Sequence, residues 1–242
     1  MLSTLQIILG LLLFLTPTTA HKPPSSKSSH ANLHKKDIAT PSPWHRLNNP
    51  ILKHTGPNKS FTLTAPPATD IWRPNTTSDN FTAPYVYRIC STASFQRISV
   101  TINADWKTRY DQGGIAIVFP NGKKGVKGAK WIKTGIEFEN GAPQLGTVGT
   151  YAFSDWSLSP VVPKGGKSAR FVVERNTTEL WVYNVVKNER YPLRELTWAF
   201  LEDRDKKNAE MWVGVYAAKP IYTEGTPSQN LSVEFKDLRI EC

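Results

Sequence analysis

Apolar and polar residues alternate along much of the chain, most clearly in residues 131–139, which end at the hairpin signal Asn140-Gly141. Residues 114–119 form a continuous apolar run that ends at a second turn sequence, Pro120-Asn121-Gly122. An alternation with a period of two is typical of a strand that buries one of its faces. Both segments are therefore predicted to be β-strands.

Six more segments have the same character and are separated by turn signals: 95–102, 144–152, 169–175, 179–186, 211–217 and 231–241. The one helix-like stretch, 190–201, is short and is interrupted by Pro192. About ten strands at this spacing favour a β-sandwich or jelly roll over a helical architecture. The all-β domain is predicted to span residues 61–242, which is long enough for one sizeable core.

Alternation also assigns the side chains of each strand to two faces. In the 131–139 strand, the core face is predicted to carry Ile132, Thr134, Ile136 and Phe138, and the opposite face Trp131, Lys133, Gly135, Glu137 and Glu139. If this strand pairs with the preceding one as a hairpin, Tyr110 and Gln112 come to lie beside its polar face. We therefore expect one sheet face to carry both aromatic and polar side chains.

The first twenty residues follow a different pattern. An apolar run over 5–15 is followed by small residues that end with Thr18 and Ala20, although no Lys or Arg precedes it. The run is shorter than the roughly 20 apolar residues that span a bilayer, and residues 1–20 are predicted to be a cleavable signal peptide, with an uncleaved anchor as the alternative. No later segment is apolar enough to span a membrane. We expect a secreted protein, extracellular or in the cell wall, without stable membrane insertion.

Residues 21–60 differ in composition from the rest of the chain. They are rich in Pro, Ser, Lys, Asn and His, and their seven Lys or Arg against one acid supply +6 of the formal net charge of +10. Such a segment cannot bury enough apolar surface to offset its ordering entropy, so it is predicted to be a mostly disordered basic arm. We interpret it as a solvated spacer or pro-segment, and contact with an anionic wall polymer or membrane surface is the alternative.

All five histidines fall within this arm. A folded domain without histidine has no His-based triad, no His general base and no His-ligated metal. Any catalysis would then use carboxylates, Tyr, Lys or Arg.

The cysteines and the glycosylation sequons agree with export. Cys90 and Cys242 are the two cysteines of the chain, and in an oxidising compartment they are predicted to form a disulfide, with two buried free thiols as the alternative. Five Asn-x-Ser/Thr sequons predict glycosylation at Asn58, Asn75, Asn80, Asn176 and Asn230, although not at all of them together.

Three motifs occur in order along the domain: Tyr110-Asp111-Gln112-Gly113-Gly114, Trp131-Ile132-Lys133-Thr134-Gly135-Ile136-Glu137-Phe138 and Ser154-Asp155-Trp156-Ser157. With residues 213–218 and a final strand through Phe235, the chain resembles a family of unknown function that includes the fungal regulation-of-enolase protein, over roughly residues 70–240. The resemblance implies a concanavalin A-like lectin/glucanase jelly-roll β-sandwich, related to an accessory module of some β-xylosidases, and no established activity. Two features depart from the family pattern: Gly113, where Ala is more common, and a lysine-rich segment over 121–130 that is longer than usual.

Residue types suited to sugar binding gather on the predicted sheet face. An aromatic ring offers an apolar platform to the C–H groups of a pyranose, while amides and carboxylates bind its hydroxyls. The predicted ligand-binding residues are Tyr110, Gln112, Trp131, Lys133, Glu137, Asp155 and Trp156. The alternative is that the two tryptophans pack in the core or on the sheet and that Asp155 caps a turn with Ser154. The leading hypothesis is a secreted, non-catalytic protein of fungal type that binds a polysaccharide or other glycan.

A secreted glycoside hydrolase or polysaccharide lyase is the second hypothesis. Glu137 and Glu139 lie two residues apart on one strand, close to the roughly 5–5.5 Å that a retaining glycosidase needs between its carboxylates. The chain lacks the Glu-x-Asp-x-Glu or Glu-x-Asp-x-x-Glu strand of hydrolases in this superfamily, because Phe138 stands where the middle acid would be. A lyase would have to use Tyr110, Lys133 or Arg109. A protein-binding effector is the third hypothesis.

Nucleic-acid binding is disfavoured, because most of the basic excess lies in the arm rather than along a folded stripe. Asp111, Asp155 and Asp237 are candidate calcium ligands, but the sequence shows no loop with clustered oxygen ligands. We therefore predict no metal and no cofactor.

Overall fold

The computed structural model describes residues 43–54, 60–201, 209–226 and 229–242. These residues form sixteen strands and one short 3-10 helix, Gly122–Lys124. The predicted signal peptide, most of the predicted arm and the sequon at Asn58 lie outside the described residues. In the part of the chain that is described, no helix is long and apolar enough to cross a membrane.

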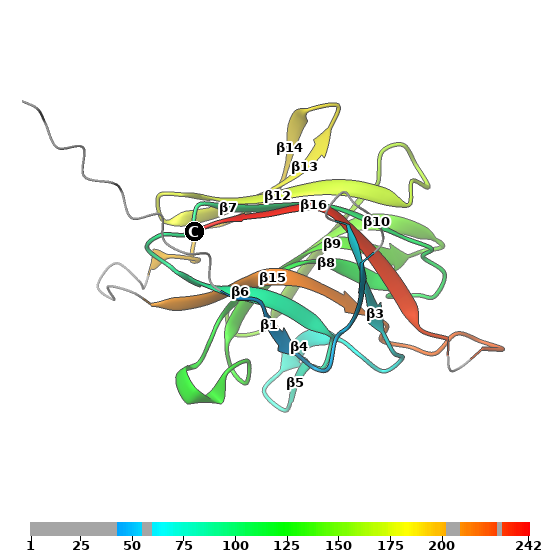
Figure 1. Cartoon of the computed structure of the whole chain (residues 1–242), viewed down its shortest axis with the longest axis horizontal. Coiled ribbons are helices and arrows are strands. Elements are labelled where there is room, and N and C mark those ends of the chain that lie inside the picture. The colour runs from blue at the N-terminus through cyan, green and yellow to red at the C-terminus, as the bar shows by residue number, and fades with distance from the viewer. Residues whose placement is uncertain (1–42, 55–59, 202–208, 227–228) are drawn as a thin grey trace, which may run out of the picture. The chain divides into compact units, whose positions relative to one another are not determined.

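Two antiparallel seven-stranded sheets lie face to face as a sandwich (Figure 1). The first sheet has the order β1 (His45–Leu47), β6 (Tyr85–Ser91), β15 (Glu210–Ala218), β8 (Gln112–Phe119), β9 (Lys130–Glu139), β10 (Ala142–Thr150) and β11 (Ser154–Pro160). The second has the order β14 (Glu189–Leu196), β13 (Glu179–Val186), β12 (Ser168–Asn176), β7 (Arg97–Ala104), β16 (Leu231–Glu241), β3 (Phe61–Ala65) and β2 (Ile51–His54). The all-β prediction is confirmed.

The main core lies between the two sheets and uses the strand faces that alternation predicts. Ile132 and Ile136 of β9 are buried there, as are Val100 of β7 and Phe171 of β12 from the opposite sheet. Phe138 is half-buried and packs against the same cluster. The outer face of β9 is thereby left to its other residues, as expected from the period of two.

A second apolar cluster lies on the outer face of the first sheet. A separate hairpin of β4 (Ile71–Asn75) and β5 (Ser78–Phe81) covers part of that face. Ile71 and Phe81 from the hairpin pack with Tyr85, Val118 and Trp131 of the sheet. The hairpin therefore divides the outer face into a covered part and an open part.

Arg73 fastens this hairpin to the sheet. Its guanidinium donates to the Asp79 carboxylate at 2.8 Å within the hairpin, and to the carbonyl of Ala129, just before β9, at 2.7 Å. Its backbone N–H donates to the Ser154 hydroxyl at 2.9 Å. Because Arg73 is buried, these bonds are shielded from water and fix the hairpin firmly.

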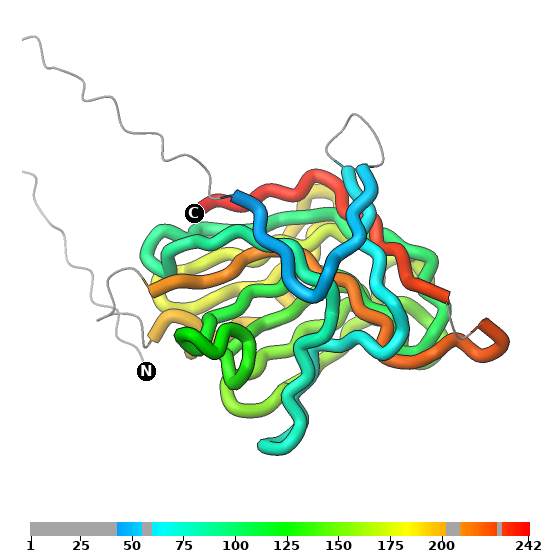
Figure 2. The backbone as a smooth tube through the Cα atoms, turned by 60° about the horizontal axis from the view of Figure 1, so that its bottom comes forward, coloured from blue at the N-terminus to red at the C-terminus, as the bar shows by residue number. Residues whose placement is uncertain are grey.

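The sequence pattern places the start of the sandwich at residue 61, but in the structure the sandwich begins earlier. β1 pairs with β6 and β2 pairs with β3, so residues 45–54 belong to the sandwich rather than to a disordered arm. β1 belongs to the first sheet and β2 to the second, and the segment that contains them is the blue part of the tube in Figure 2. His45 stacks on Tyr87 with ring centroids 5.4 Å apart, so the folded part does contain histidine. Both strands lie at sheet edges, where one partner suffices and few apolar residues are needed.

The helix-like stretch at 190–201 is wrong as a prediction. Its first part belongs to β14, which pairs with β13 at the edge of the second sheet. Pro192 is tolerated there because an edge strand has one side without ladder partners, and the register shifts between Val182 and Tyr183 opposite it. Pairing along the sheet edge overrides the local helical spacing.

The predicted disulfide is confirmed. It joins Cys90 in β6 of the first sheet to Cys242, which follows β16 of the second, so one covalent bond links the two layers. Four of the predicted glycosylation sites have exposed side chains, namely Asn75, Asn80, Asn176 and Asn230.

Candidate functional site

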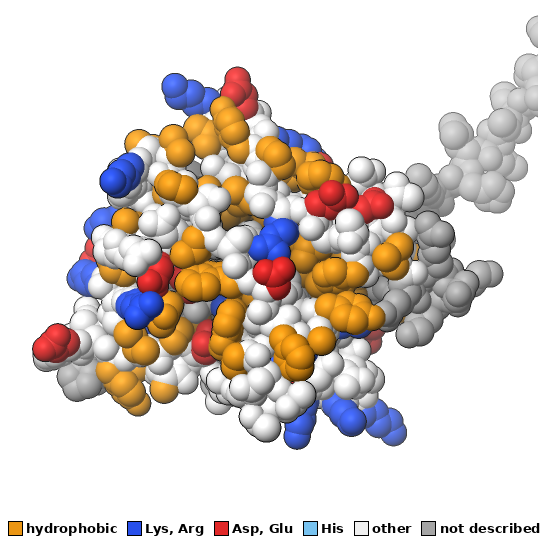
Figure 3. All heavy atoms as spheres, turned by 180° about the vertical axis from the view of Figure 1, so that it is seen from behind, with side chains coloured by type: hydrophobic (Ala, Val, Ile, Leu, Met, Phe, Trp, Pro, Cys, Tyr) orange, Lys and Arg blue, Asp and Glu red, His pale blue; other side chains and the backbone are white. Residues whose placement is uncertain are grey.

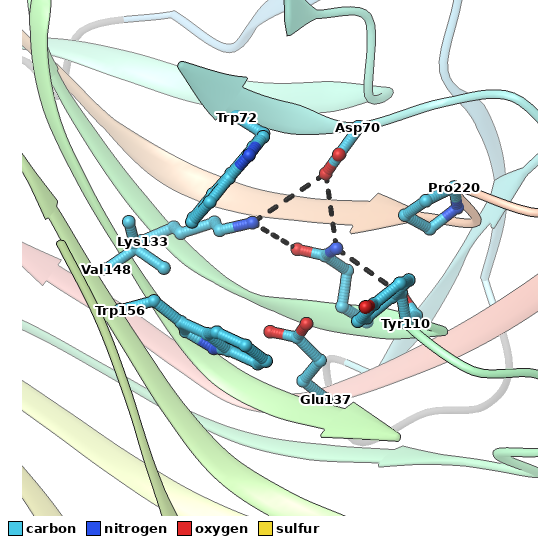
Figure 4. A pocket seen from close by; sticks show the side chains of 9 residues that line it. Asp70, Trp72, Tyr110, Lys133, Glu137, Val148, Trp156 and Pro220 are labelled. Atoms are coloured by element: carbon cyan, nitrogen blue, oxygen red, sulfur yellow. Dashed lines mark hydrogen bonds and ion pairs between the residues drawn. The ribbon is translucent and has the colours of Figure 1, made fainter. Parts of the chain in front are cut away.

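A pocket of about 200 Å³ opens on the outer face of the first sheet, beside the β4–β5 hairpin (Figure 4). Its floor comes from β8, β9 and β10. Its walls come from the start of the hairpin, from β11, and from the segments that precede β8 and follow β15. The lining residues are Asp70, Trp72, Tyr110, Gln112, Lys133, Glu137, Val148, Trp156 and Pro220.

A row of glycines crosses the sheet beneath this site. Gly114 of β8 lies opposite Gly135 of β9, which lies opposite Gly146 of β10. All three are on the outer face, because they alternate by two with Gln112 and Lys133. Cβ atoms added at Gly114 and Gly135 would lie 2.0 and 2.1 Å from backbone oxygens of the neighbouring strand, so the absence of side chains there lets β8 and β9 approach closely.

The rows on either side of the glycines supply the polar groups of the pocket. On one side Gln112 lies opposite Glu137. On the other side Lys133 lies opposite Val148, which in turn lies opposite Trp156. The strand register therefore brings residues from β8, β9, β10 and β11 together on either side of the glycine row.

A hydrogen-bonded network joins one side of the pocket to the other. The Lys133 ammonium donates to Gln112 Oε1 at 2.7 Å and lies 3.8 Å from Asp70 Oδ1. Gln112 Nε2 donates to the same Asp70 oxygen and to the Tyr110 carbonyl, both at 3.3 Å. The Tyr216 hydroxyl donates to Gln112 Oε1 at 3.2 Å, and burial raises its pKa well above the ordinary value, so it keeps its proton. A buried network with these partners is fixed before a ligand arrives.

Glu137 stands apart from this network. Its side chain is buried beside the Trp156 indole, which slightly favours the charged form of the carboxylate. Burial raises the pKa of Glu137, and the charge of Lys133 opposes that rise only in part. Lys133, the base that lines the pocket, makes its ion pair with Asp70 instead.

Three aromatic rings form the walls. The rings of Trp72 and Trp156 have centroids 6.4 Å apart and planes at 79°, and those of Tyr110 and Trp156 are also 6.4 Å apart, with planes at 68°. The Lys133 ammonium lies 5.9 Å from the Trp72 ring. Tyr110 has a φ of 66°, a left-handed conformation that is costly for a large side chain. The rings thus enclose the pocket at steep angles to one another.

Lys219 holds the walls in place from behind. Its ammonium donates to Asp111 Oδ1 at 3.0 Å and to Thr108 Oγ1 at 2.9 Å, and its backbone exchanges hydrogen bonds with Thr69. Both charged side chains are 2% exposed. Thr69, Asp111 and Lys219 each adjoin a lining residue in sequence, so one buried ion pair positions three walls.

The structure brings together most of the predicted ligand-binding residues, namely Tyr110, Gln112, Lys133, Glu137 and Trp156. Trp131 lies on the predicted face but does not reach the pocket: the hairpin covers it, it is 1% exposed, and the ring of Phe81 meets it edge to face at 6.5 Å. Asp155 is not a lining residue either. Its side chain is 78% exposed and forms a 3.3 Å ion pair with Arg194. It follows that packing explains Trp131 and a surface ion pair explains Asp155.

Glu139 and the lysine-rich segment 121–130 lie outside the pocket. Glu139, the predicted second carboxylate of a hydrolase pair, accepts from Arg109 Nε at 3.0 Å and does not line the pocket. The lysine-rich segment 121–130 contributes to a separate hollow that also contains Trp198 and Trp212. The described residues contain no group of three or more His, Cys, Asp or Glu side chains that could hold a metal ion.

Sequence reasoning missed Asp70, Trp72, Val148 and Pro220. The first two precede or begin the β4–β5 hairpin, where prolines, threonines and asparagines obscure any alternation. One signal was present: Gly114 and Gly135 occupy outward positions of neighbouring strands, which marks a place where side chains are excluded.

Exposed aromatic side chains continue beyond the pocket. Tyr151 and Phe153, in the turn between β10 and β11, are each more than a third exposed. Apolar side chains reach the surface at several places on the side of the molecule shown in Figure 3, with charged groups between them.

Comparison with solved structures shows the fold. A functionally unknown protein from Saccharomyces cerevisiae has a TM-score of 0.64 at 21% identity, over 82% of this chain and 96% of that one. The Bacteroides ovatus structure described as "Xyloglucan PUL GH43B" has a TM-score of 0.54 at 16% identity, over 81% of this chain and 36% of that one. A Bacillus licheniformis GH43 protein, BlXynB, has a TM-score of 0.52 at 13% identity, over 75% and 32%. The chain spans about a third of the two GH43 proteins, and the predicted concanavalin A-like jelly-roll sandwich is confirmed.

Comparison of sequences shows the family. An uncharacterized protein of Emericella nidulans is 43% identical over 182 residues, which cover 75% of this chain and 86% of that protein. Residues 47–242 match the family described as "Protein of unknown function (DUF1349)". None of the relatives named above bears a description that concerns enolase. The chain therefore belongs to DUF1349, a family of unknown function.

Proposed function

We propose that this protein binds a carbohydrate, without catalysis, in the pocket on the outer face of the first sheet. The observation that carries the proposal is the enclosure of fixed polar groups by three aromatic rings. Aromatic faces pack against the C–H groups of a sugar ring, while Lys133 donates to its hydroxyls and Glu137 accepts from them.

The size of the pocket supports a single sugar unit as its occupant. At about 200 Å³ it is smaller than the roughly 300–1,000 Å³ of sites for drug-sized ligands. A chain end or one residue of a polysaccharide fills such a space. Because Gln112 and Lys133 are already held by their partners, binding costs little ordering of side chains.

Glycoside hydrolysis is a second candidate, and one observation favours it. Asp70 and Glu137 both line the pocket, and burial raises the pKa of Glu137, as a general acid requires. The name of the Bacteroides relative also refers to xyloglucan. Against this candidate, Asp70 accepts from Gln112 and lies beside Lys133, so its carboxylate is engaged in the network.

Binding and hydrolysis are separated by one set of measurements. Calorimetric titration with a panel of neutral, amino and acidic oligosaccharides is expected to show binding that weakens at least tenfold in Trp156→Ala, which corresponds to about 1.4 kcal/mol. Asp155→Asn is the matched control, since Asp155 does not line the pocket, and its affinity is expected to equal that of the native protein. Unchanged binding in Trp156→Ala would place the ligand elsewhere. Release of reducing ends from any oligosaccharide of the panel would favour the hydrolase.

We also propose that the protein is secreted. The disulfide and the four exposed sequons support this, since both belong to an oxidising export route. Expression in a eukaryotic host is expected to give a protein in the medium that begins after residue 20 and loses mass on deglycosylation. An intracellular protein that keeps residues 1–20 would contradict the proposal.

A further inference from the structure

We infer that the pocket selects a sugar unit that carries a free, protonated amino group. This inference rests on the proposed carbohydrate binding and names the chemical class of the unit that fills the pocket.

The balance of charge in the pocket points to a cationic group. Asp70 and Glu137 are its two lining acids, and Lys133 is its one lining base. Lys133 is engaged with Asp70 and with Gln112, which leaves the Glu137 carboxylate buried beside an indole N–H but without a cation of its own in the pocket. A buried carboxylate is costly unless it is paired. A ligand ammonium supplies that partner, whereas a uronate would add a third carboxylate.

The aromatic walls favour the same group. Trp72 and Tyr110 both meet Trp156 at steep angles, so the rings form a box rather than a single flat platform. A cation within about 6 Å of an aromatic centroid is attracted by the ring. Lys133 already occupies such a position at Trp72, 5.9 Å from its centroid. The Arg109 guanidinium occupies such a position at Tyr110, 4.6 Å from its centroid, so Trp156 is the wall that remains for the ligand.

Several charged or titratable groups face Glu137, and they set how its affinity for an amine depends on pH. Lys133 and Glu139 share β9 with it, Asp70 faces it from the segment before β4, and Tyr216 faces it from β15. Arg109 neutralises Glu139 at 3.0 Å. Binding of an ammonium is expected to weaken at acidic pH, where Glu137 takes up a proton, and at alkaline pH, where the sugar amine loses one. A neutral sugar shows no alkaline loss.

The test compares ligands that differ only at the amine. The full chain is titrated calorimetrically with a fully deacetylated chitin tetramer, its N-acetylated counterpart, a β-1,4-glucan tetramer and an oligouronate. We expect the free amine to bind at least tenfold more tightly than the other three. Glu137→Gln is expected to abolish that preference, and Asp155→Asn to retain it. Because the chain has a formal net charge of +10, general electrostatic attraction would favour the oligouronate instead.

Equal affinity for the free amine and its N-acetylated counterpart would overturn the inference, as would a preference that survives Glu137→Gln. If a neutral oligosaccharide binds and Trp156→Ala weakens it, with no preference for the amine, the inference fails while the proposed function stands. If no oligosaccharide binds, both fail. Should Glu137→Gln not fold, the native protein decides: the absence of an alkaline loss of amine binding contradicts the inference.

Discussion

Glu137 affects stability as well as recognition. Burial raises its pKa in the folded protein, so the folded state holds the proton more tightly than the unfolded state does. The stability that the protonated Glu137 contributes is therefore complete at a pH below its pKa in the unfolded chain. It is lost as the pH rises through its pKa in the folded protein. We expect Glu137→Gln, relative to the native protein, to gain stability as pH rises from about 4 to about 8. Urea unfolding across that range measures the difference, and a difference that stays constant or falls with pH would contradict this.

Breaking the buried ion pair between Lys219 and Asp111 is expected to be strongly destabilising. Lys219→Met removes one partner of an ion pair whose side chains are both 2% exposed and leaves the Asp111 charge buried. The expected loss in the free energy of unfolding is about 3–5 kcal/mol. Adding Asp111→Asn removes the stranded charge, so the double variant is expected to recover part of the loss. A single variant as stable as the native protein would show that Asp111 finds another partner.

The sequence predicts which residues line the pocket where the strands alternate, and does not where they fail to alternate. A period of two places Gln112, Lys133 and Glu137 on one face of neighbouring strands, and Tyr110 lies just before the first of these strands. Trp131 follows the same period, but alternation cannot show that a distant hairpin covers it. For the same reason Trp72 on that hairpin stayed hidden, since a contact between remote segments leaves no local pattern.

The pairing of β8 with β9 positions the polar residues of the pocket. This pairing depends on glycines at the points where the two strands approach closely. A Cβ added at Gly135 would lie 2.1 Å from the backbone oxygen of Gly113, a distance that forces the strands apart. Gly135→Ala is expected to cost about 3 kcal/mol or more, at or above the upper end of typical overpacking. Gly146→Ala is the matched control, since its nearest neighbours are side-chain atoms at 3.4 Å. Thermal or urea unfolding of the two variants measures the contrast, and equal stability would contradict the prediction.

The local sequence pattern predicts the central strands better than the edge strands. Strands such as β9, β13 and β16, which each lie between two partners, are predicted to within a residue or so, because they bury one face against the core. Edge strands are not: β1 and β2 have few buried side chains, and β14 was given a helical spacing around Pro192. An edge strand is defined by the neighbour it pairs with, and the sequence of the strand itself carries little of that information.

At the scale of the whole molecule, the Cys90–Cys242 bond ties the two sheets together. It connects residues that are 152 apart in sequence. In the entropic account, such a bond lowers the conformational entropy of the unfolded chain and thereby stabilises the folded state by about 5 kcal/mol. The double variant Cys90→Ala/Cys242→Ala is expected to unfold at a markedly lower guanidinium concentration. Reduction of the native protein gives an independent comparison. An unchanged midpoint in both would mean that the unfolded chain is already compact.

The position of β16 has a consequence for biosynthesis. It lies between β7 and β3, yet it follows every other strand in sequence. While the polypeptide is still emerging from the ribosome, β7 and β3 have no partner between them, and the second sheet exists as two separate pieces. Nascent chains that end before residue 231 therefore expose the unpaired backbone edges of β7 and β3, and the second sheet closes only when residues 231–241 become available.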